Sequence, residues 1–419
     1  MIRVEEARQL LLTIVRSMPA EVVSLRNAIG RVLAADMRAP LPMPLFDQSA
    51  VDGYVLSSRR LPDGSYRVVG MIRAGDIPPK TIQSGQAYRI FTGAAVPPRA
   101  YGVVMQEHVQ CTGDRLDVPA DRIVQGSHIR KKGGHFRKGA VVLQRSALLN
   151  AAAIGLLASL GKQTVRVYRK PVIGLLVTGS ELRKAGTVLR EGEIYESNSS
   201  TLIAALESCG YSVKQLAFAR DRMAEVERQA KRLMKVCDVV LFSGGISVGD
   251  FDFVLPVLGR LRVKQLFYKV AQKPGKPLYA GSLGRKIVFA LPGNPASALV
   301  CLYEYVLPTL DGMQMKPHRG LVQVGLPLAS ELSLKADRDQ FLRARVVHGH
   351  VDVLTAQDSD NLRSFAESNA LVFVPAGVSR LSAGEQVIVH LLPQQEIVAS
   401  NSLDHAGSII RNVCRSVGS

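Results

Sequence analysis

Strand-length apolar runs alternate with helical patterns between Pro171 and about Leu310. This alternation predicts a parallel sheet with helices on both faces, because each helix returns the chain to the same edge of the sheet. The last helix should begin at Asn294, a typical N-cap residue, with Pro295 after it. The expected strands cover residues 172–177, 212–218, 238–242, 266–270 and 286–291, and the expected helices cover 201–209, 223–236 and 294–309. We therefore predict a doubly wound parallel α/β domain.

Three loops rich in glycine and proline adjoin the expected strands, at residues 243–253, 272–278 and 291–297. Glycines after a strand allow backbone N–H groups to converge on an anion, and a following helix adds its dipole. Ligands of parallel sheets bind beyond the carboxyl ends of the strands, where residues 178–181 also fall. The loops therefore predict a site for an anionic, phosphorylated ligand.

The net charge of the chain is +18, but the excess is concentrated in two stretches. Residues 122–180 contain eleven Lys or Arg and no Asp or Glu, and residues 253–301 contain eight and none. One stretch runs into an expected binding loop, and the other contains two such loops. A small anionic ligand accounts for this distribution better than nucleic acid does, with clustered solvated cations as the alternative.

Composition disfavours several other classes of protein. Trp is absent and aromatic residues make up 5% of the chain, so stacking platforms for single-stranded nucleic acid are not expected. Glu5, Glu6 and Arg8 interrupt the N-terminal apolar pattern, which is typical of an amphipathic helix and not of a secretion signal. The longest uncharged apolar stretch, 146–161, is too short to cross a membrane. Five scattered cysteines without a CxxC pair indicate reduced thiols, and we predict a cytoplasmic protein.

The remainder of the chain predicts further domains. Short β-like runs between Gly/Pro turns indicate β-rich regions on both sides of the α/β domain. No GxGxxG or GxxxxGK[ST] motif occurs, which disfavours ordinary dinucleotide and P-loop sites. The predicted domains are an elongated helical and β N-terminal domain (1–40 with 140–169), a β-rich domain inserted in it (41–139), the α/β domain (170–316), a C-terminal β domain (317–395) and a tail (396–419).

Several acidic residues lie where a ligand loop or a turn is expected. Asp250 and Asp252 belong to the first glycine-rich loop, Glu181 follows the first expected strand, and Asp52 stands in an Asp-Gly turn. Each also has an ordinary structural interpretation, as a helix cap, a first-turn acid or a turn residue.

Three lysines, Lys269, Lys273 and Lys276, surround the Pro-Gly pair of the second loop. Each can pair with phosphate or face water. Phosphoryl chemistry needs carboxylates that hold Mg²⁺ beside amides and ammonium groups that hold phosphate. The combination on one chain therefore favours a site for such chemistry.

Seven motifs in order make the chain resemble the molybdopterin molybdenumtransferase family, the gephyrin-like enzymes of molybdenum cofactor biosynthesis, over roughly residues 1–392. The motifs are PLFDQSAVDGY (44–54), TGA (92–94), GSHIR (126–130), TGSEL (178–182), SGGISVGDFD (243–252), KPGKP (273–277) and LPGNP (291–295). The resemblance implies four domains and an elongated homodimer with its active site in a cleft between the subunits.

The resemblance also implies a reaction. Adenylylated molybdopterin and molybdate would give molybdenum cofactor and AMP, with a divalent metal such as Mg²⁺. The implied partners are the enzyme that adenylylates molybdopterin and the molybdoenzymes that receive the cofactor.

Carried over by motif position, the resemblance assigns roles to particular residues. Asp52, Glu181, Asp221 and Asp252 would be catalytic, and Asp52, Glu181 and Asp252 would also hold the metal. The implied substrate-binding residues are Thr92, Gly179, Ser243, Gly244, Gly245, Ser247, Asp250, Lys269, Lys273, Lys276, Pro292, Asn294, Arg343 and Ser359.

Five positions depart from the family pattern. His135, Tyr101, Ser180 and Glu196 stand where the family has aspartate, and Asp358 stands where it has glycine. Loss of hard oxygen ligands and gain of an imidazole weaken the case for an ordinary Mg²⁺ site, and His135 is a further candidate ligand. One alternative is a catalytically weakened paralogue that binds molybdopterin or serves as a scaffold. A second is a competence-damage-type nucleotide pyrophosphatase or deamidase, which shares the α/β domain but lacks the segment 46–54.

Overall fold

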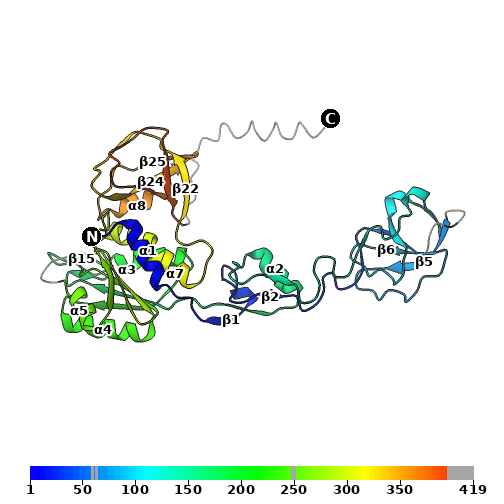
Figure 1. Ribbon diagram of the computed structural model, residues 1–419, viewed down its shortest axis with the longest axis horizontal. Helices are drawn as coiled ribbons and strands as arrows, with labels where there is room; N and C mark the ends of the chain where they lie inside the picture. The colour runs from blue at the N-terminus through cyan, green and yellow to red at the C-terminus, as the bar shows by residue number, and fades with distance from the viewer. Residues whose placement is uncertain (58–60, 62–64, 247–251, 394–419) are drawn as a thin grey trace. The chain divides into compact units, whose positions relative to one another are not determined.

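The computed structural model describes residues 1–57, 61, 65–246 and 252–393, which form two compact units (Figure 1). The first unit contains Met1–Glu21, Gly30–Val32 and the described chain from Val167, and the second contains Val22–Ile29 and Leu33–Arg166. The chain passes between the units within β1 (Ala20–Ser24), at both ends of Gly30–Val32, and within β12 (Thr164–Tyr168). No helix in these described residues is long and apolar enough to cross a membrane.

A six-stranded sheet forms the centre of the first unit (Figure 1). Four neighbouring strands run parallel, and the next strand, β20, runs antiparallel to the neighbours on both of its sides. In spatial order the strands are β16 (Val213–Ala219), β13 (Ile173–Thr178), β17 (Val239–Ser243), β21 (Lys286–Leu291), β20 (Tyr279–Leu283) and β18 (Lys264–Tyr268). The predicted α/β fold is confirmed, and β20 is an addition to it.

Two apolar cores cover the opposite faces of this sheet. Along β13, Leu175 and Val177 belong to one core, whereas Leu176 between them belongs to the other. Because side chains alternate across a strand, a continuous apolar run can supply both cores. The first core is covered by α1 (Val4–Ile14), α3 (Asn198–Ser208), α6 (Pro295–Cys301) and α7 (Leu307–Met313), and the second by α4 (Met223–Val236) and α5 (Val254–Arg260).

The helix predicted over residues 294–309 extends further and changes its winding. A π-helical turn, Leu302–Val306, joins α6 to α7. Pro308 follows this turn; proline has no N–H to donate, and its ring crowds the carbonyl four residues earlier, so a wider turn accommodates it. Glu304 lies within the turn, where it is buried and accepts from Nη2 of Arg8 at 2.6 Å. Its other oxygen lies 2.8 Å from Nδ1 of His390.

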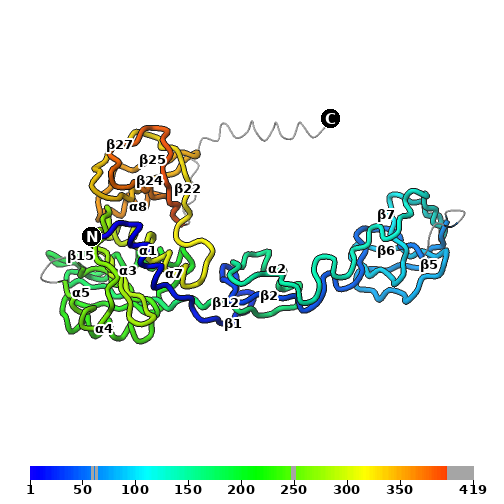
Figure 2. Tube along the Cα trace, viewed as in Figure 1, coloured from blue at the N-terminus to red at the C-terminus, as the bar shows by residue number. Residues whose placement is uncertain are grey.

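The C-terminal part of the first unit is a second, mainly antiparallel sheet with α8 (Leu362–Glu367) beside it (Figure 2). Its strands in spatial order are β19 (Gln272–Lys273), β24 (Asp339–Val347), β26 (Ala370–Val374), β28 (Gln386–Leu391) and β22 (Val322–Pro327). β25 (His350–Val353) pairs with β24 in the same sheet, and β23 (Leu332–Ser333) and β27 (Arg380–Leu381) form a separate pair in the C-terminal part. Another separate pair, β14 (Leu182–Arg183) and β15 (Ile194–Tyr195), follows β13. Because β19 pairs with β24, Lys273, the first residue of the KPGKP loop, belongs to the sheet of the C-terminal part.

The second unit contains a six-stranded sheet of its own. In spatial order its strands are β7 (Gly102–Met105), β4 (Gly53–Leu56), β6 (Gln86–Ile90), β5 (Ser65–Ile72), β9 (Arg115–Asp117) and β8 (Gln110–Thr112). The unit also has α2 (Ala151–Ser159), the pair β3 (Gln48–Ser49) and β10 (Ile129–Arg130), the pair β2 (Met37–Arg38) and β11 (Val141–Leu143), and short 3-10 turns at Leu25–Asn27, Gln106–His108 and Ala120–Arg122. The domain boundaries predicted from the sequence are finer than these two units and stay predictions.

Candidate active site

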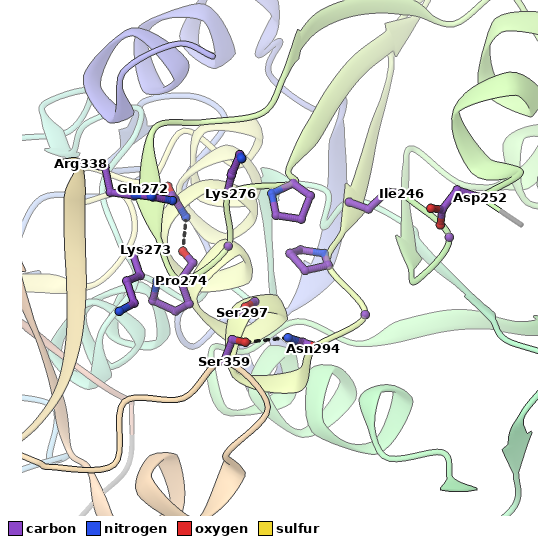
Figure 3. Close-up of a pocket in the computed structure, with 15 residues that line it drawn as sticks. Ile246, Asp252, Gln272, Lys273, Pro274, Lys276, Asn294, Ser297, Arg338 and Ser359 are labelled. Atoms are coloured by element: carbon purple, nitrogen blue, oxygen red, sulfur yellow. Dashed lines mark hydrogen bonds between the residues drawn. The ribbon is translucent and has the colours of Figure 1, made fainter. Parts of the chain in front are cut away.

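A cavity of about 450 Å³ lies in the first unit, beside the carboxyl ends of β17 and β21 (Figure 3). Three of its walls are the glycine- and proline-rich loops, and the fourth comes from the C-terminal sheet domain. The lining residues are Gly245, Ile246, Asp252, Gln272, Lys273, Pro274, Gly275, Lys276, Pro277, Pro292, Gly293, Asn294, Ser297, Arg338 and Ser359. The loops that the sequence singled out therefore meet in one place.

The loops after β17 and β21 leave the sheet side by side, because Ser243 is the register partner of Leu291 in the parallel ladder. Gly244 has a φ of +90°, and a Cβ on it would lie 2.7 Å from the carbonyl oxygen of Thr178. Only glycine satisfies both constraints. The glycine thus allows the loop to turn back against the end of β13.

Asn294 precedes α6 as predicted, with Pro295 at the first helical position, but its side chain does not cap the helix. Its Nδ2 instead donates to the Oγ of Ser359 at 2.6 Å (Figure 3). The backbone N–H of Ser297 donates to the carbonyl of Ser359 at 3.3 Å. The loop that carries Ser359 is therefore attached to the start of α6.

The KPGKP loop is held by β19, in which Lys273 pairs in register with Gln340 of β24. The buried Gln272 side chain donates to the carbonyl of Pro274 at 2.9 Å and accepts from the hydroxyl of Tyr305. Gly275 has a φ of +91°, and a Cβ there would lie 2.7 Å from the Sγ of Cys301. The loop is thus packed tightly behind the two lysines that line the cavity.

Three cations and one carboxylate line the described part of the cavity. Lys273 and Arg338 lie on one side of it and Asp252 on the other, with Lys276 also on the lining (Figure 3). Arg338 donates from Nε to its neighbour Asp337 at 2.8 Å, a pair that is partly exposed. This excess of positive charge suits a ligand with several anionic oxygens.

Two other predicted site residues lie at the same cavity. Pro292 lines it, and Ser243 lies two residues before the lining residue Gly245. Lys269 does not line it. Its φ is +67°, and its Nζ lies 4.9 Å from the ring centroid of Tyr268, at cation–π distance. The hydroxyl of Tyr268 donates to the carbonyl of Ile246 at 2.7 Å, and this bond holds the first glycine-rich loop. Lys269 therefore follows directly after a residue that positions this loop.

Gly179, Glu181 and Asp221 lie together at the ends of β13 and β16, outside the cavity lining. The N–H of Ser180 donates to Oδ2 of Asp221 at 2.7 Å, and the N–H of Asp221 donates to Oγ of Ser180 at 3.0 Å. A Cβ on Gly179 would lie 2.6 Å from Leu182. Ser180, a departure from the family pattern, thus forms a reciprocal pair with Asp221.

Arg343 is fully buried and supports the cavity from behind. Its Nη2 donates to the carbonyls of Ala356 and Asp358, at 2.9 and 3.0 Å, directly before Ser359. The guanidinium also lies over the ring of Phe365, 5.6 Å from its centroid. Its Nε and Nη1 have no hydrogen-bond partner within the described chain. Asp358 therefore uses its backbone in this support.

Asp52 and Thr92 form a hydrogen-bonded pair in the second unit. Both the N–H and the Oγ1 of Thr92 donate to Oδ1 of Asp52, each at 2.7 Å. These bonds from Thr92 lower the pKa of Asp52, because they favour the charged carboxylate. His135 has an exposed side chain, and its N–H donates to the carbonyl of Met43 at 2.9 Å. Tyr101 donates its N–H to the carbonyl of Leu56 at 2.8 Å.

A complete metal site is not formed by the described residues alone, because no three His, Cys, Asp or Glu side chains among them could hold one ion. Mg²⁺ commonly takes one or two carboxylates and obtains further ligands from substrate phosphates and water. Asp252, a single carboxylate on the lining of the cavity, fits a Mg²⁺ site that substrate phosphates and water complete. Ser247 and Asp250, both predicted to bind substrate, lie outside the described residues.

Comparison with known proteins places the chain in a family. Residues 2–161 match the family described as the MoeA N-terminal region (domain I and II), residues 174–312 a probable molybdopterin binding domain, and residues 326–392 the MoeA C-terminal region (domain IV). A molybdopterin molybdenumtransferase of Haemophilus influenzae is 34% identical, over 89% of this chain and 95% of that protein. One of Bacillus subtilis is 30% identical, over 90% of each.

Solved structures agree with these sequence matches. The crystal structure of a molybdopterin biosynthesis moeA protein from Pyrococcus horikoshii has a TM-score of 0.79 and 28% identity, and the match covers 93% of this chain and 100% of that one. The fold is that of a doubly wound α/β protein whose cavity lies at the carboxyl ends of the central strands β17 and β21. The chain belongs to the molybdopterin molybdenumtransferase family, and the resemblance stated from its motifs is confirmed.

Two residues of the site region were not predicted from the sequence. Arg338 lines the cavity from the start of β24, and no glycine-rich motif surrounds it. Asn198, at the start of α3, contacts two of the loops from behind. The available signal for Asn198 was a partial match to the Tyr-Asp-x-Asn pattern of the family, in which Tyr195 and Asn198 agree and Glu196 replaces the aspartate.

Proposed function

We propose that this protein inserts molybdenum into adenylylated molybdopterin and releases AMP, the last step of molybdenum cofactor assembly. The observation that supports the proposal most is the cavity at the ends of β17 and β21. Its lining includes Asp252 together with Lys273, Lys276 and Arg338. Phosphate and molybdate both present several anionic oxygens, which the three cations can hold. Membership in the molybdopterin molybdenumtransferase family supports the same reaction.

In this proposal the cations position the phosphate oxygens while a water oxygen attacks the molybdopterin phosphorus and the anhydride bond breaks, so that AMP leaves with the bridging oxygen. Positive groups fixed around that bond stabilise the charge that develops on the leaving phosphate. Asp252 would share Mg²⁺ with the substrate phosphates, and the ion would neutralise part of their charge. Asn294 and Ser359, through their mutual bond, keep the C-terminal wall of the cavity in place.

We also propose that the protein acts as a homodimer. The residues that the family pattern assigns to the site are divided, with Asp52 and Thr92 in one unit and the cavity in the other. In a homodimer, residues of one subunit can complete the site of its partner, which the resemblance implies. Light scattering at micromolar concentration should give the mass of a dimer. A monomer with full activity would contradict this arrangement.

The reaction is tested by mixing the protein with adenylylated molybdopterin, molybdate and Mg²⁺ and measuring AMP. We expect AMP release that needs both molybdate and the metal. Tight binding of the substrate without AMP release would favour the alternative of a molybdopterin-binding scaffold. Cleavage of nucleotide substrates without molybdate would favour a pyrophosphatase. The enzyme that adenylylates molybdopterin and the recipient molybdoenzymes are the proposed partners.

A further inference from the structure

Asn198 joins two loops of the cavity from behind. It is the first residue of α3, and its side-chain Nδ2 donates to Oγ of Ser243 at 2.9 Å and to the carbonyl of Gly293 at 2.7 Å. Ser243 ends β17, directly before the glycines of the first loop, and Gly293 lies in the third. One amide group therefore contacts both segments.

The two loops approach each other closely at this point. A Cβ on Gly293 would lie 3.7 Å from the Cα of Gly244, which is ordinary van der Waals contact. The N–H of Gly244 donates to the carbonyl of Leu291 at 3.3 Å, the last ladder bond before the loops diverge. Beyond it, Asn198 supplies the next polar connection between them.

The orientation of the Asn198 amide is fixed by its partners. A backbone carbonyl only accepts hydrogen bonds, so the group that faces the Gly293 oxygen must be the NH₂. The Oδ1 of Asn198 is then buried, without a hydrogen-bond partner among the described residues. Burying an unpaired carbonyl is unfavourable. The two hydrogen bonds that Nδ2 donates therefore determine the orientation of the Asn198 side chain, at the expense of a bond to Oδ1.

A neighbouring carboxylate fixes the turn on which Asn198 stands. Glu196 accepts from the N–H of Ser199 at 2.7 Å and also from the Ser199 hydroxyl. A side-chain acceptor for a free N–H at the start of a helix stabilises its first turn. Glu196, which stands where the family has aspartate, therefore keeps the acceptor that holds α3 and Asn198 in place.

We propose that Asn198 is a positioning residue that sets the spacing between the loops 243–246 and 292–294, and through it the fit of the phosphate groups in the cavity. Asn198 does not line the cavity, so it acts through Gly293 and the residues after Ser243. The identity of the ligand in this inference rests on the proposed function, whereas the positioning role rests on the two hydrogen bonds of Asn198 to the loops.

The test compares Asn198→Ala, Ser243→Ala and the double variant with the full-length wild-type protein. Losing two hydrogen bonds to the loops should raise KM for adenylylated molybdopterin by about 10-fold, with kcat changed less than about 3-fold. Ser243→Ala removes one of the bonds, so its effect should be smaller in the Asn198→Ala background than alone. Asn198→Asp should be at least as damaging as Asn198→Ala at neutral pH, because a carboxylate would face the Gly293 oxygen.

Asn150→Ala provides a matched control. Asn150 caps α2 in the second unit, where its side chain accepts from the N–H of Ala153 at 2.9 Å. Its loss should lower Tm without changing KM, as for a cap with a structural role only. The same result for Asn198→Ala, with a lower Tm and an unchanged KM, would overturn the proposal, as would strictly additive effects with Ser243→Ala.

AMP alone separates failure of this inference from failure of the proposed reaction. If the wild-type protein releases no AMP, titration calorimetry with AMP still reports on the cavity. Weaker AMP binding by Asn198→Ala, by about 10-fold, would then support the positioning role. Equal binding by the folded variant and the wild type would contradict it. The calorimetry therefore tests the positioning role whether or not the protein releases AMP from adenylylated molybdopterin.

Discussion

Asn294 donates from Nδ2 to Oγ of Ser359 at 2.6 Å, and this bond links the start of α6 to the loop before α8. Ser359→Ala removes the acceptor of the Asn294 amide and with it the bond between the two segments. We expect KM for adenylylated molybdopterin to rise about 5- to 10-fold, the equivalent of one hydrogen bond of about 1 kcal/mol. Steady-state kinetics of AMP release measures this. Ser333→Ala, at an exposed position of the same domain, should leave KM unchanged.

Asp252 is the carboxylate of the described cavity lining, so its charge can be tested directly. Asp252→Asn keeps the size of the side chain and deletes the charge. If Asp252 holds a divalent metal beside the phosphates, AMP release should fall by at least ~100-fold, because an electrostatic contribution of a few kcal/mol disappears. Thermal unfolding should change little. Asp352→Asn, at an exposed position of β25, is the control. Full activity of Asp252→Asn would show that the metal assignment is wrong.

The central sheet was predictable because its strands are buried on both faces. Leu175, Leu176 and Val177 supply two cores in turn, so the sequence there is continuously apolar and easily located. β20 was missed because it contains the small residues Ala280, Gly281 and Ser282, which have little strand propensity of their own. Its conformation is set by pairing with β21 on one side and β18 on the other.

The site was predictable only where it depends on local backbone chemistry. Gly244 and Gly275 adopt positive φ beside atoms that exclude a Cβ, and such constraints leave glycine motifs in the sequence. Asn198 reaches Ser243 across 45 positions of the chain, and no local pattern encodes that contact. Arg343 illustrates the converse, since the family resemblance implied that it binds substrate, whereas its guanidinium is buried against backbone carbonyls.

Glu304 should be important for stability, because it connects three segments of the first unit. It pairs with Arg8 of α1 and His390 of β28, and both Glu304 and His390 are buried. Glu304→Ala would leave these partners without their acceptor, at a cost of about 3–5 kcal/mol. Urea unfolding measures the loss. The exposed i,i+4 pair of Arg363 and Glu367 provides the contrast, and Glu367→Ala should cost less than about 1 kcal/mol.

Asp238 should make stability depend on pH in acid. Burial acts to raise its pKa, but hydrogen bonds from the Arg169 guanidinium and the Val172 N–H outweigh burial and lower the pKa below its usual 3.8. A depressed folded-state pKa contributes stability that is complete above the unfolded-state value and is lost as pH falls through the folded-state value. Asp238→Asn should therefore be less stable than wild type at pH 6, and the difference should shrink below about pH 4. A difference that stays constant down to pH 2 would contradict this assignment.

His135 tests whether departures from the family pattern weaken this protein. It is exposed in the second unit and stands where the family has aspartate, an oxygen ligand that Mg²⁺ prefers to imidazole. We expect His135→Asp to raise Mg²⁺-dependent AMP release, with unchanged thermal stability because the side chain is exposed. His135→Asn separates charge from size, since it removes the imidazole without adding a carboxylate, and should give no such gain. If His135→Asp instead lowers activity, the histidine has a role of its own and the chain is a divergent catalyst, because restoring the family's ligand would then have removed a group on which the reaction depends.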